Sequence, residues 1–175
     1  MRRVGLVCRS RGSPYHSSAH LIPTHKSCGF IHGHSYFVDV EIEGERAGEF
    51  QFVVDFKDVK ESLRTICDSL DHRLLVPIFN EHISFKEIPD DEKSMEKIEK
   101  ADNLQFKIDK KGYTIPQVDC KLLPLKSSAA EDLAQYFAEH LTEDLLNKGY
   151  DNLSSISACV NEGIGQGALY KKEIN

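Results

Sequence analysis

Hydrophobic and polar residues alternate over residues 35–43, which is the period of a strand with one buried face. The apolar face of this strand consists of Tyr36, Val38, Val40 and Ile42. A second alternating segment, 52–56, follows a loop at 44–48, and the two segments together predict a hairpin. Shorter strands are expected over 4–8 and 156–160.

Two other segments have the period of a helix. In the first, residues at i, i+4, i+7, i+8 and i+11 form an apolar stripe, namely Val59, Leu63, Ile66, Cys67 and Leu70. Asp55 or Asp58 is placed to cap its start. The second helix is expected over about 128–148, because leucine or phenylalanine recurs every fourth residue from Leu133, and Gly149 predicts its end.

Residues 77–124 interrupt this pattern. The part from 85 to 101 mixes charges of both signs, which is typical of a solvated surface. Apolar alternation on both sides of residues 110–112 predicts an added hairpin. We therefore expect a single β-rich domain over residues 1–175, with two helices and an insertion at about 77–124.

The composition narrows the class of protein. The chain has 175 residues and a formal charge of −6, with 40% hydrophobic and 29% charged residues, as in soluble globular domains. No apolar run approaches the roughly 20 residues of a membrane span, the first residues lack the pattern of a signal peptide, and the acidic balance argues against a nucleic-acid partner. Five scattered cysteines without a CxxC motif indicate a cytoplasmic protein and not a disulfide framework.

Histidines supply the candidate chemistry. His32 and His34 are two residues apart and therefore point to the same face of the predicted strand, on the side of Tyr36. His20, from a neighbouring strand, could complete a three-histidine site, which keeps a fourth metal position open as catalytic zinc sites do. Two alternatives stay open on the residues alone. Cys28 could close the site as a fourth, structural ligand, or the histidines could be buried and satisfied by hydrogen bonds.

Six ordered elements resemble the 6-pyruvoyl-tetrahydropterin synthase and 6-carboxytetrahydropterin synthase family, over about residues 15–76 and 125–171. They are Ser17-Ser18-Ala19-His20, Cys28 followed by His32-Gly33-His34, Val54-Asp55-Phe56, Leu70-Asp71-His72, Ser128-Ala129-Ala130-Glu131, and Val160-Asn161-Glu162 with Leu169-Tyr170. The resemblance implies an α+β T-fold, in which an antiparallel sheet carries two helices on one face. Subunits of this family close their sheets into a barrel, usually as a hexamer of two stacked trimers with active sites between subunits.

The resemblance also implies roles for the matching residues. His20, His32 and His34 would hold Zn²⁺, and the implied substrate is 7,8-dihydroneopterin triphosphate. Cys28 would be the base, since a nearby metal or histidinium favours the thiolate. Without the resemblance, Cys28 is more simply a small buried residue.

Asp71 and His72 would form a proton relay, in which the carboxylate fixes the tautomer of the imidazole. Adjacent residues need not touch each other, and one of them could reach Cys28 across a subunit interface. The alternative is that Asp71 merely ends a helix, with His72 as a favourable charge there.

Two glutamates are candidates for binding the pterin. Glu162 is an even number of residues after Ile156, so its side chain is expected on the same inward face of the strand. A buried carboxylate there matches the amino and N3–H donors of a pterin. For Glu131 two interpretations are open: a second pterin contact, or the glutamate of a capping box with Ser128. Lys26 and Arg73 flank the motifs and are the cations nearest in sequence for a triphosphate.

The spacing of three residues between Cys28 and the HGH motif resembles the 6-carboxytetrahydropterin synthases of the queuosine/7-deazaguanine pathway. A pyruvoyl-forming synthase of biopterin synthesis, a non-catalytic zinc or pterin-binding module, and a hydrolase with Cys28 as nucleophile are the alternatives. The chain departs from the family in the long insertion, which would cover or reshape the pocket. It also has His16 where the family usually has phenylalanine, as a packing variant or as an extra polar group near the metal.

Overall fold

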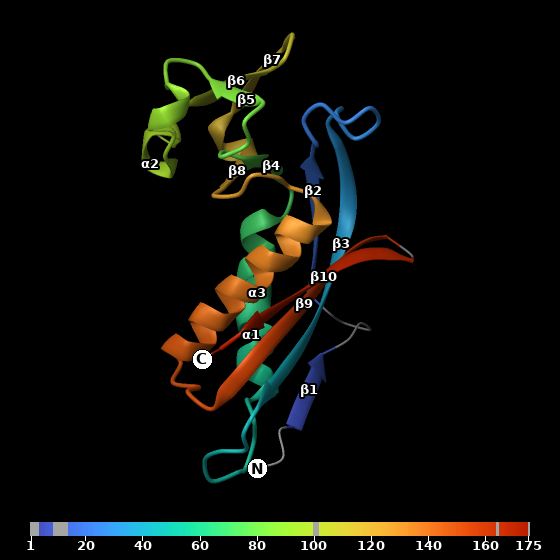
Figure 1. Ribbon diagram of the computed structural model, residues 1–175, viewed down its shortest axis with the longest axis vertical. Coiled ribbons are helices and arrows are strands. Elements are labelled where there is room, and N and C mark those ends of the chain that lie inside the picture. Colours follow the sequence, from blue (N-terminus) through green and yellow to red (C-terminus); the bar gives the residue numbers. More distant parts are fainter. Residues whose placement is uncertain (1–3, 9–13, 100–101, 164, 175) are drawn as a thin grey trace.

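The computed structural model describes residues 4–8, 14–99, 102–163 and 165–174. Its main sheet consists of β1 (Val4–Cys8), β2 (Tyr15–His20), β3 (His32–Gly44), β4 (Leu74–Pro77), β8 (Cys120–Leu123), β9 (Leu153–Gly163) and β10 (Gln166–Glu173). The strand order is β10-β9-β3-β2-β4-β8, and β1 also pairs with β3 (Figure 1). The long strand β3 therefore lies at the centre and contacts three others.

Pairing within this sheet is antiparallel except at one edge. Strand β4 runs parallel to β2 and to β8. All four residues of β4 are buried, and a strand covered on both faces has no alternating pattern in its sequence. The expected α+β class is confirmed, and the sheet is mixed where a purely antiparallel one was expected.

Helices α1 (Phe56–Leu70) and α3 (Ala130–Asn147) pack against each other on one face of the sheet (Figure 1). The apolar face of β3 meets them there, with Leu63 and Phe137 fully buried. Asp55 caps α1 by accepting a hydrogen bond from the backbone N–H of Lys57 at 2.8 Å, as predicted. Within the described residues, the helices are too short or too polar to cross a bilayer.

The strand predicted over 52–56 is wrong. Only Ala47 and Phe52 form an isolated bridge, and α1 already begins at Phe56. Val53 and Val54 are both buried while Phe52 is exposed, so the side chains do not alternate between two faces. The segment ends in the capped start of α1 at Asp55, and its short apolar alternation does not form a strand.

The insertion forms a second sheet, from β5 (Ile83–Phe85), β6 (Asn103–Ile108) and β7 (Lys111–Pro116), with the order β5-β6-β7. The predicted hairpin is confirmed by β6 and β7, and the charged segment contains the one-turn helix α2 (Met95–Ile98). The insertion packs around a second hydrophobic core, which it shares with β4, β8 and Leu21, the residue directly after β2. In Figure 1 this unit lies at one end of the molecule, above β4 and β8.

Candidate metal centre and active-site cavity

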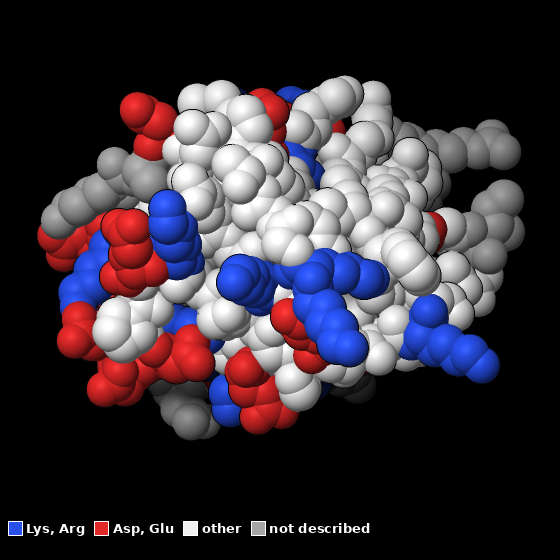
Figure 2. Space-filling model, turned by 90° about the horizontal axis from the view of Figure 1, so that it is seen from above, with Lys and Arg blue, Asp and Glu red and all other residues white. Residues whose placement is uncertain are grey.

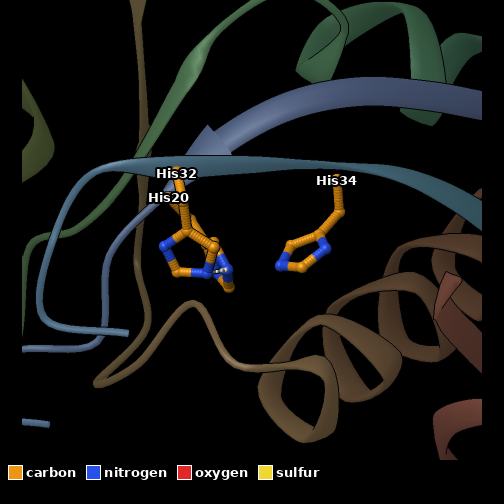
Figure 3. A group of neighbouring side chains, drawn as sticks. All are labelled: His20, His32 and His34. Carbon is orange, nitrogen blue, oxygen red and sulfur yellow. Dashed lines mark hydrogen bonds between the residues drawn. The ribbon is translucent and has the colours of Figure 1, made fainter. Parts of the chain in front are cut away.

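Strands β2 and β3 bring three histidines together. His20 and His32 are opposite each other in the antiparallel ladder, and His34 lies on the same face two residues later. One ligand nitrogen from each ring lies within 4.8 Å of the others. Figure 3 shows the rings of His20 and His32 close together, with His34 beside them. The predicted convergence of the three side chains is confirmed.

Backbone carbonyls set the tautomers of two of these rings. Nδ1 of His20 lies 2.8 Å from the carbonyl oxygen of Ser128, and Nδ1 of His32 lies 2.8 Å from that of Phe30. A carbonyl oxygen only accepts, so each Nδ1 donates and each Nε2 of a neutral ring carries a lone pair. Metal-binding histidines are typically oriented by such carbonyls.

The two Nε2 atoms, of His20 and His32, lie 3.1 Å apart. With a lone pair on both nitrogens, neither can donate to the other, and the contact is repulsive unless a cation lies between them. Tetrahedral zinc with Zn–N bonds of about 2.0–2.1 Å holds its ligand nitrogens about 3.3 Å apart. The spacing of the His20 and His32 nitrogens therefore fits such an ion, and three imidazoles also suit other first-row metals.

Burial keeps His20 in the metal-binding form. Desolvation lowers its pKa to about 4, and the positive charges of His32 and His34 act in the same direction when these rings are protonated. The hydrogen bond to Ser128 opposes this shift. At neutral pH the His20 ring is uncharged and its Nε2 is free to coordinate.

The histidines line a cavity of about 930 Å³. Cys28, Glu131 and Glu162 line the same cavity, so three further predicted site residues meet the histidine cluster within one chain. The wall also includes His25 and, from β10, Gly167. This arrangement combines a thiol, carboxylates and a candidate metal site in one volume.

A compact loop of residues 21–31 presents Cys28 to this cavity. The N–H of Ile22 donates to the carbonyl of Cys28 at 2.8 Å, and the N–H of Gly29 donates to the carbonyl of His25 at 3.0 Å. A Cβ atom on Gly29 would lie 2.3 Å from that carbonyl oxygen, so the turn requires glycine there.

The side chain of His25 closes the same turn. Its Nδ1 accepts a hydrogen bond from the N–H of Cys28 at 2.9 Å. His25 is not among the residues predicted from the motifs, and its position three residues before Cys28 is the one sequence signal that points to it.

Comparison with known proteins places the chain in a family. A family model described as 6-pyruvoyl tetrahydropterin synthase matches residues 11–173. The chain belongs to this family. A relative from Methanocaldococcus jannaschii, provisionally named 6-carboxy-5,6,7,8-tetrahydropterin synthase, is 48% identical over 156 residues, which cover 89% of this chain and 88% of the relative.

Solved structures of the 6-pyruvoyl tetrahydropterin synthase family have the same fold. The enzyme from Plasmodium vivax has a TM-score of 0.81 at 26% identity, covering 99% of this chain and 100% of its own. The enzyme from Plasmodium falciparum has a TM-score of 0.80 at 27% identity, covering 98% of this chain and 99% of its own. The expected T-fold is confirmed.

Asp71 and His72 lie outside the cavity of this member of the family. Asp71 ends α1 and accepts hydrogen bonds from the backbone N–H of Ser17 at 2.8 Å and from Nδ1 of His72 at 2.7 Å. The bond from Ser17 is the main reason why the pKa of Asp71 is lowered, and His72 adds to it. The His72 side chain is 83% exposed, and its backbone has a positive φ of 55°. The pair is in contact, and within one chain it does not meet Cys28.

Glu131 is exposed at the start of α3, and the capping-box interpretation is wrong. Helix α3 begins at Ala130 with Ala129 at the cap position, and the hydroxyl of Ser128 donates to the carbonyl of Leu21 at 3.2 Å. Of the two cations considered for a triphosphate, neither Lys26 nor Arg73 lines the cavity.

His16 is fully buried and stacks between Tyr36 and Phe137, with ring centroids 4.8 and 5.9 Å away. The hydroxyl of Ser18 donates to the carbonyl of Leu70, so Nδ1 of His16 is the donor in its 2.7 Å contact with that hydroxyl. Its Nε2 finds no hydrogen-bond partner among the described residues. These contacts support the packing interpretation of His16.

Proposed function

We propose that the chain is a zinc-dependent 6-carboxy-5,6,7,8-tetrahydropterin synthase that acts on 7,8-dihydroneopterin triphosphate in the queuosine/7-deazaguanine pathway. The observation that carries this proposal is the cavity in which three imidazoles lie with Cys28 and Glu162. The name of the relative that is 48% identical supports the carboxy-forming reaction. The spacing between Cys28 and His32 supports the same subfamily.

The proposed reaction converts the substrate and one water into 6-carboxytetrahydropterin, acetaldehyde and triphosphate. The C–O bond to triphosphate and one C–C bond of the side chain break, and water supplies the second carboxylate oxygen. The ring gains the two hydrogens that the side chain loses by oxidation, so no external reductant is needed.

The predicted site residues that line the cavity have distinct roles in this reaction. His20, His32 and His34 would hold the zinc, which as a Lewis acid supplies polarisation of the side-chain hydroxyls and acidification of the neighbouring C–H bonds. Cys28 takes up the released proton as thiolate. Glu162 accepts hydrogen bonds from the amino and N3–H groups of the pterin, and Glu131 is a second contact at the cavity rim.

His72, oriented by Asp71, would pass protons at a site completed by a neighbouring subunit. The sheet face opposite the helices carries exposed apolar side chains, among them Tyr15 and Phe37, whose rings lie 6.2 Å apart, and Leu169. Covering this face would bury apolar surface, and pairing the edge strands of neighbouring chains into a closed barrel would remove the open sheet edges. We propose that it assembles into a homo-oligomer, a hexamer built from two trimers.

Product analysis tests the reaction. The zinc-loaded protein is incubated anaerobically with 7,8-dihydroneopterin triphosphate, and the products are identified by mass spectrometry. Acetaldehyde with 6-carboxytetrahydropterin is the expected result. A 6-pyruvoyl product, as the names of the family and of the Plasmodium enzymes suggest, would replace the carboxy-forming proposal by the alternative. Unchanged substrate with zinc still bound would indicate a binding module.

The Cys28→Ala variant separates catalysis from metal binding. We expect it to retain zinc and to lose turnover, because the thiol is the base and not a ligand. A variant that loses zinc would show instead that Cys28 closes a structural site. No covalent adduct on Cys28 is expected in the intact mass during turnover, and an acyl-enzyme would support the hydrolase alternative.

Mixing two inactive variants tests the shared site. Cys28→Ala and His72→Ala chains are unfolded together, refolded at equal ratio, and assayed. If Cys28 and His72 act across an interface, about a quarter of the interfaces in mixed oligomers carry both residues and activity returns. Mixed oligomers without activity would show that His72 does not act on Cys28 in a neighbouring chain.

A further inference from the structure

The insertion contacts the loop that carries Cys28. Lys111 is the first residue of β7, and its Nζ donates to the carbonyl oxygen of Gly29 at 3.0 Å. The same ammonium lies 4.1 Å from the centre of the Phe30 ring, within the range of a cation–π interaction. One side chain thus holds the two residues that directly follow Cys28.

The strand that presents Lys111 is itself firmly held. Lys111 pairs with Ile108 in the ladder between β6 and β7, and Ile108 is buried in the core of the insertion. That core also contains Leu21, the residue after His20. The insertion is therefore packed against the end of the strand that carries one of the three cavity histidines.

The backbone of Gly29 is fixed from two sides. Its N–H donates within the loop to His25, and its carbonyl accepts from Lys111. Because the amide of Cys28 is also bonded to the His25 ring, the backbone around the thiol has little freedom to shift. Loss of the contact from Lys111 would release one side of this turn.

We propose that Lys111 is a positioning residue, through which the insertion holds Cys28 at the cavity. A displacement of about 1 Å at a reacting group can cost on the order of 100-fold in rate, so such a contact would matter for turnover. The catalytic consequence rests on the proposed function, whereas the structural role can be measured without it.

Three variants and a control test this role. Lys111→Met removes the charge and the donor but keeps the apolar stem, and Lys111→Arg keeps a cation that can donate. Phe30→Leu removes the ring and leaves the bond to Gly29. Figure 2 shows a band of Lys and Arg side chains across this end of the molecule, so loss of charge alone needs a control. Lys110→Met removes the charge of the exposed neighbour of Lys111.

Two readouts do not depend on the reaction. The first is hydrogen exchange of peptides that cover residues 21–31. The second is the rate at which iodoacetamide alkylates Cys28, followed on the Cys28 peptide. We expect Lys111→Met to raise both rates at least about fivefold, with a smaller rise in Phe30→Leu and wild-type rates in Lys111→Arg and Lys110→Met. If Lys111→Met matches Lys110→Met in both, the proposal is wrong.

Turnover distinguishes positioning from substrate binding. We expect kcat of Lys111→Met to fall about tenfold at nearly unchanged KM and unchanged zinc content, with rescue in Lys111→Arg. A raised KM with an unchanged kcat would overturn the proposal in favour of a contact with the triphosphate. A wild-type protein that does not convert the pterin would refute the proposed function, and the exchange and alkylation rates would still decide the role of Lys111.

Discussion

Replacement of the buried His16 by phenylalanine is expected to make the protein more resistant to acid. The His16 ring stacks between Tyr36 and Phe137, and phenylalanine can keep these contacts. Desolvation by burial lowers the pKa of His16 from 6.5 to about 4, although the charge of Asp71 raises it in part. The folded protein therefore resists the protonation of this ring.

The direction in which stability changes with pH follows from the number of protons that the folded and unfolded states bind. Between pH 6.5 and 4 the unfolded chain holds more protons at His16 than the folded chain, so the free energy of unfolding falls as the pH decreases. The contribution is complete above pH 6.5 and is lost as the pH approaches 4. The difference between the two pKa values corresponds to a contribution of about 3 kcal/mol to the free energy of unfolding at high pH. About 2 kcal/mol of this contribution is lost at pH 5.

Guanidinium unfolding of the wild type and His16→Phe at pH 7.5 and pH 5.0 measures this effect. Both proteins are compared at the same protomer concentration and with a chelator, so that oligomerisation and metal loss do not differ. We expect the stability of His16→Phe relative to the wild type to increase by about 2 kcal/mol at the lower pH. The titration of His20 and of other groups is common to both proteins and cancels.

Ser18→Ala is the matched control. It removes the hydroxyl that contacts Nδ1 and leaves the buried ring in place. Because burial and not this bond is the main cause of the lowered pKa, Ser18→Ala should keep the acid dependence of the wild type. If the difference in the free energy of unfolding between the wild type and His16→Phe is the same at both pH values, burial does not lower the pKa of His16 and the prediction is wrong.

Three further predictions concern the cavity and the core. His34→Ala should lower the zinc bound per chain at least about tenfold, measured by elemental analysis after dialysis, and full retention would exclude His34 as a ligand. Glu162→Gln should weaken the binding of a reduced pterin by about 10- to 100-fold in calorimetry at unchanged zinc content, and equal affinity would show that its carboxylate does not hold the pterin. Phe137→Ala should destabilise the fold by about 3–5 kcal/mol in guanidinium unfolding, and a loss below about 1 kcal/mol would contradict its place in the core.

Elements with one buried face were predictable from the sequence. The alternation along β3 and the stripe of α1 both reflect a polar face opposite an apolar one. The convergence of His32 and His34 followed from the same parity, and the pairing of β2 with β3 added His20. The strand alternation, the helix stripe and the shared face of His32 and His34 depend only on the spacing of residues along one segment, which can be read from the sequence.

Other features depend on partners that no local pattern describes. Strand β4 is buried along its whole length, so its sequence does not reveal that it runs parallel to β2 and β8. The contact between Lys111 and Gly29 joins residues 82 positions apart, and no motif links them. The place of His72 outside the cavity could not be inferred either, because its neighbour Asp71 is fixed by a bond to the distant Ser17.

The parallel pairing of β4 with β8 restricts how this chain can be shortened. Leu74 lies opposite Cys120 and Pro77 opposite Leu123, so the insertion leaves at one end of the strand pair and returns at the other. Parallel neighbours need a crossover of about a dozen residues or more, whereas a two-residue turn can join only antiparallel strands. A variant in which the insertion is shortened would therefore have to keep a connection that runs back along both strands. Joining Pro77 to Cys120 by a short turn would detach β8 from the sheet.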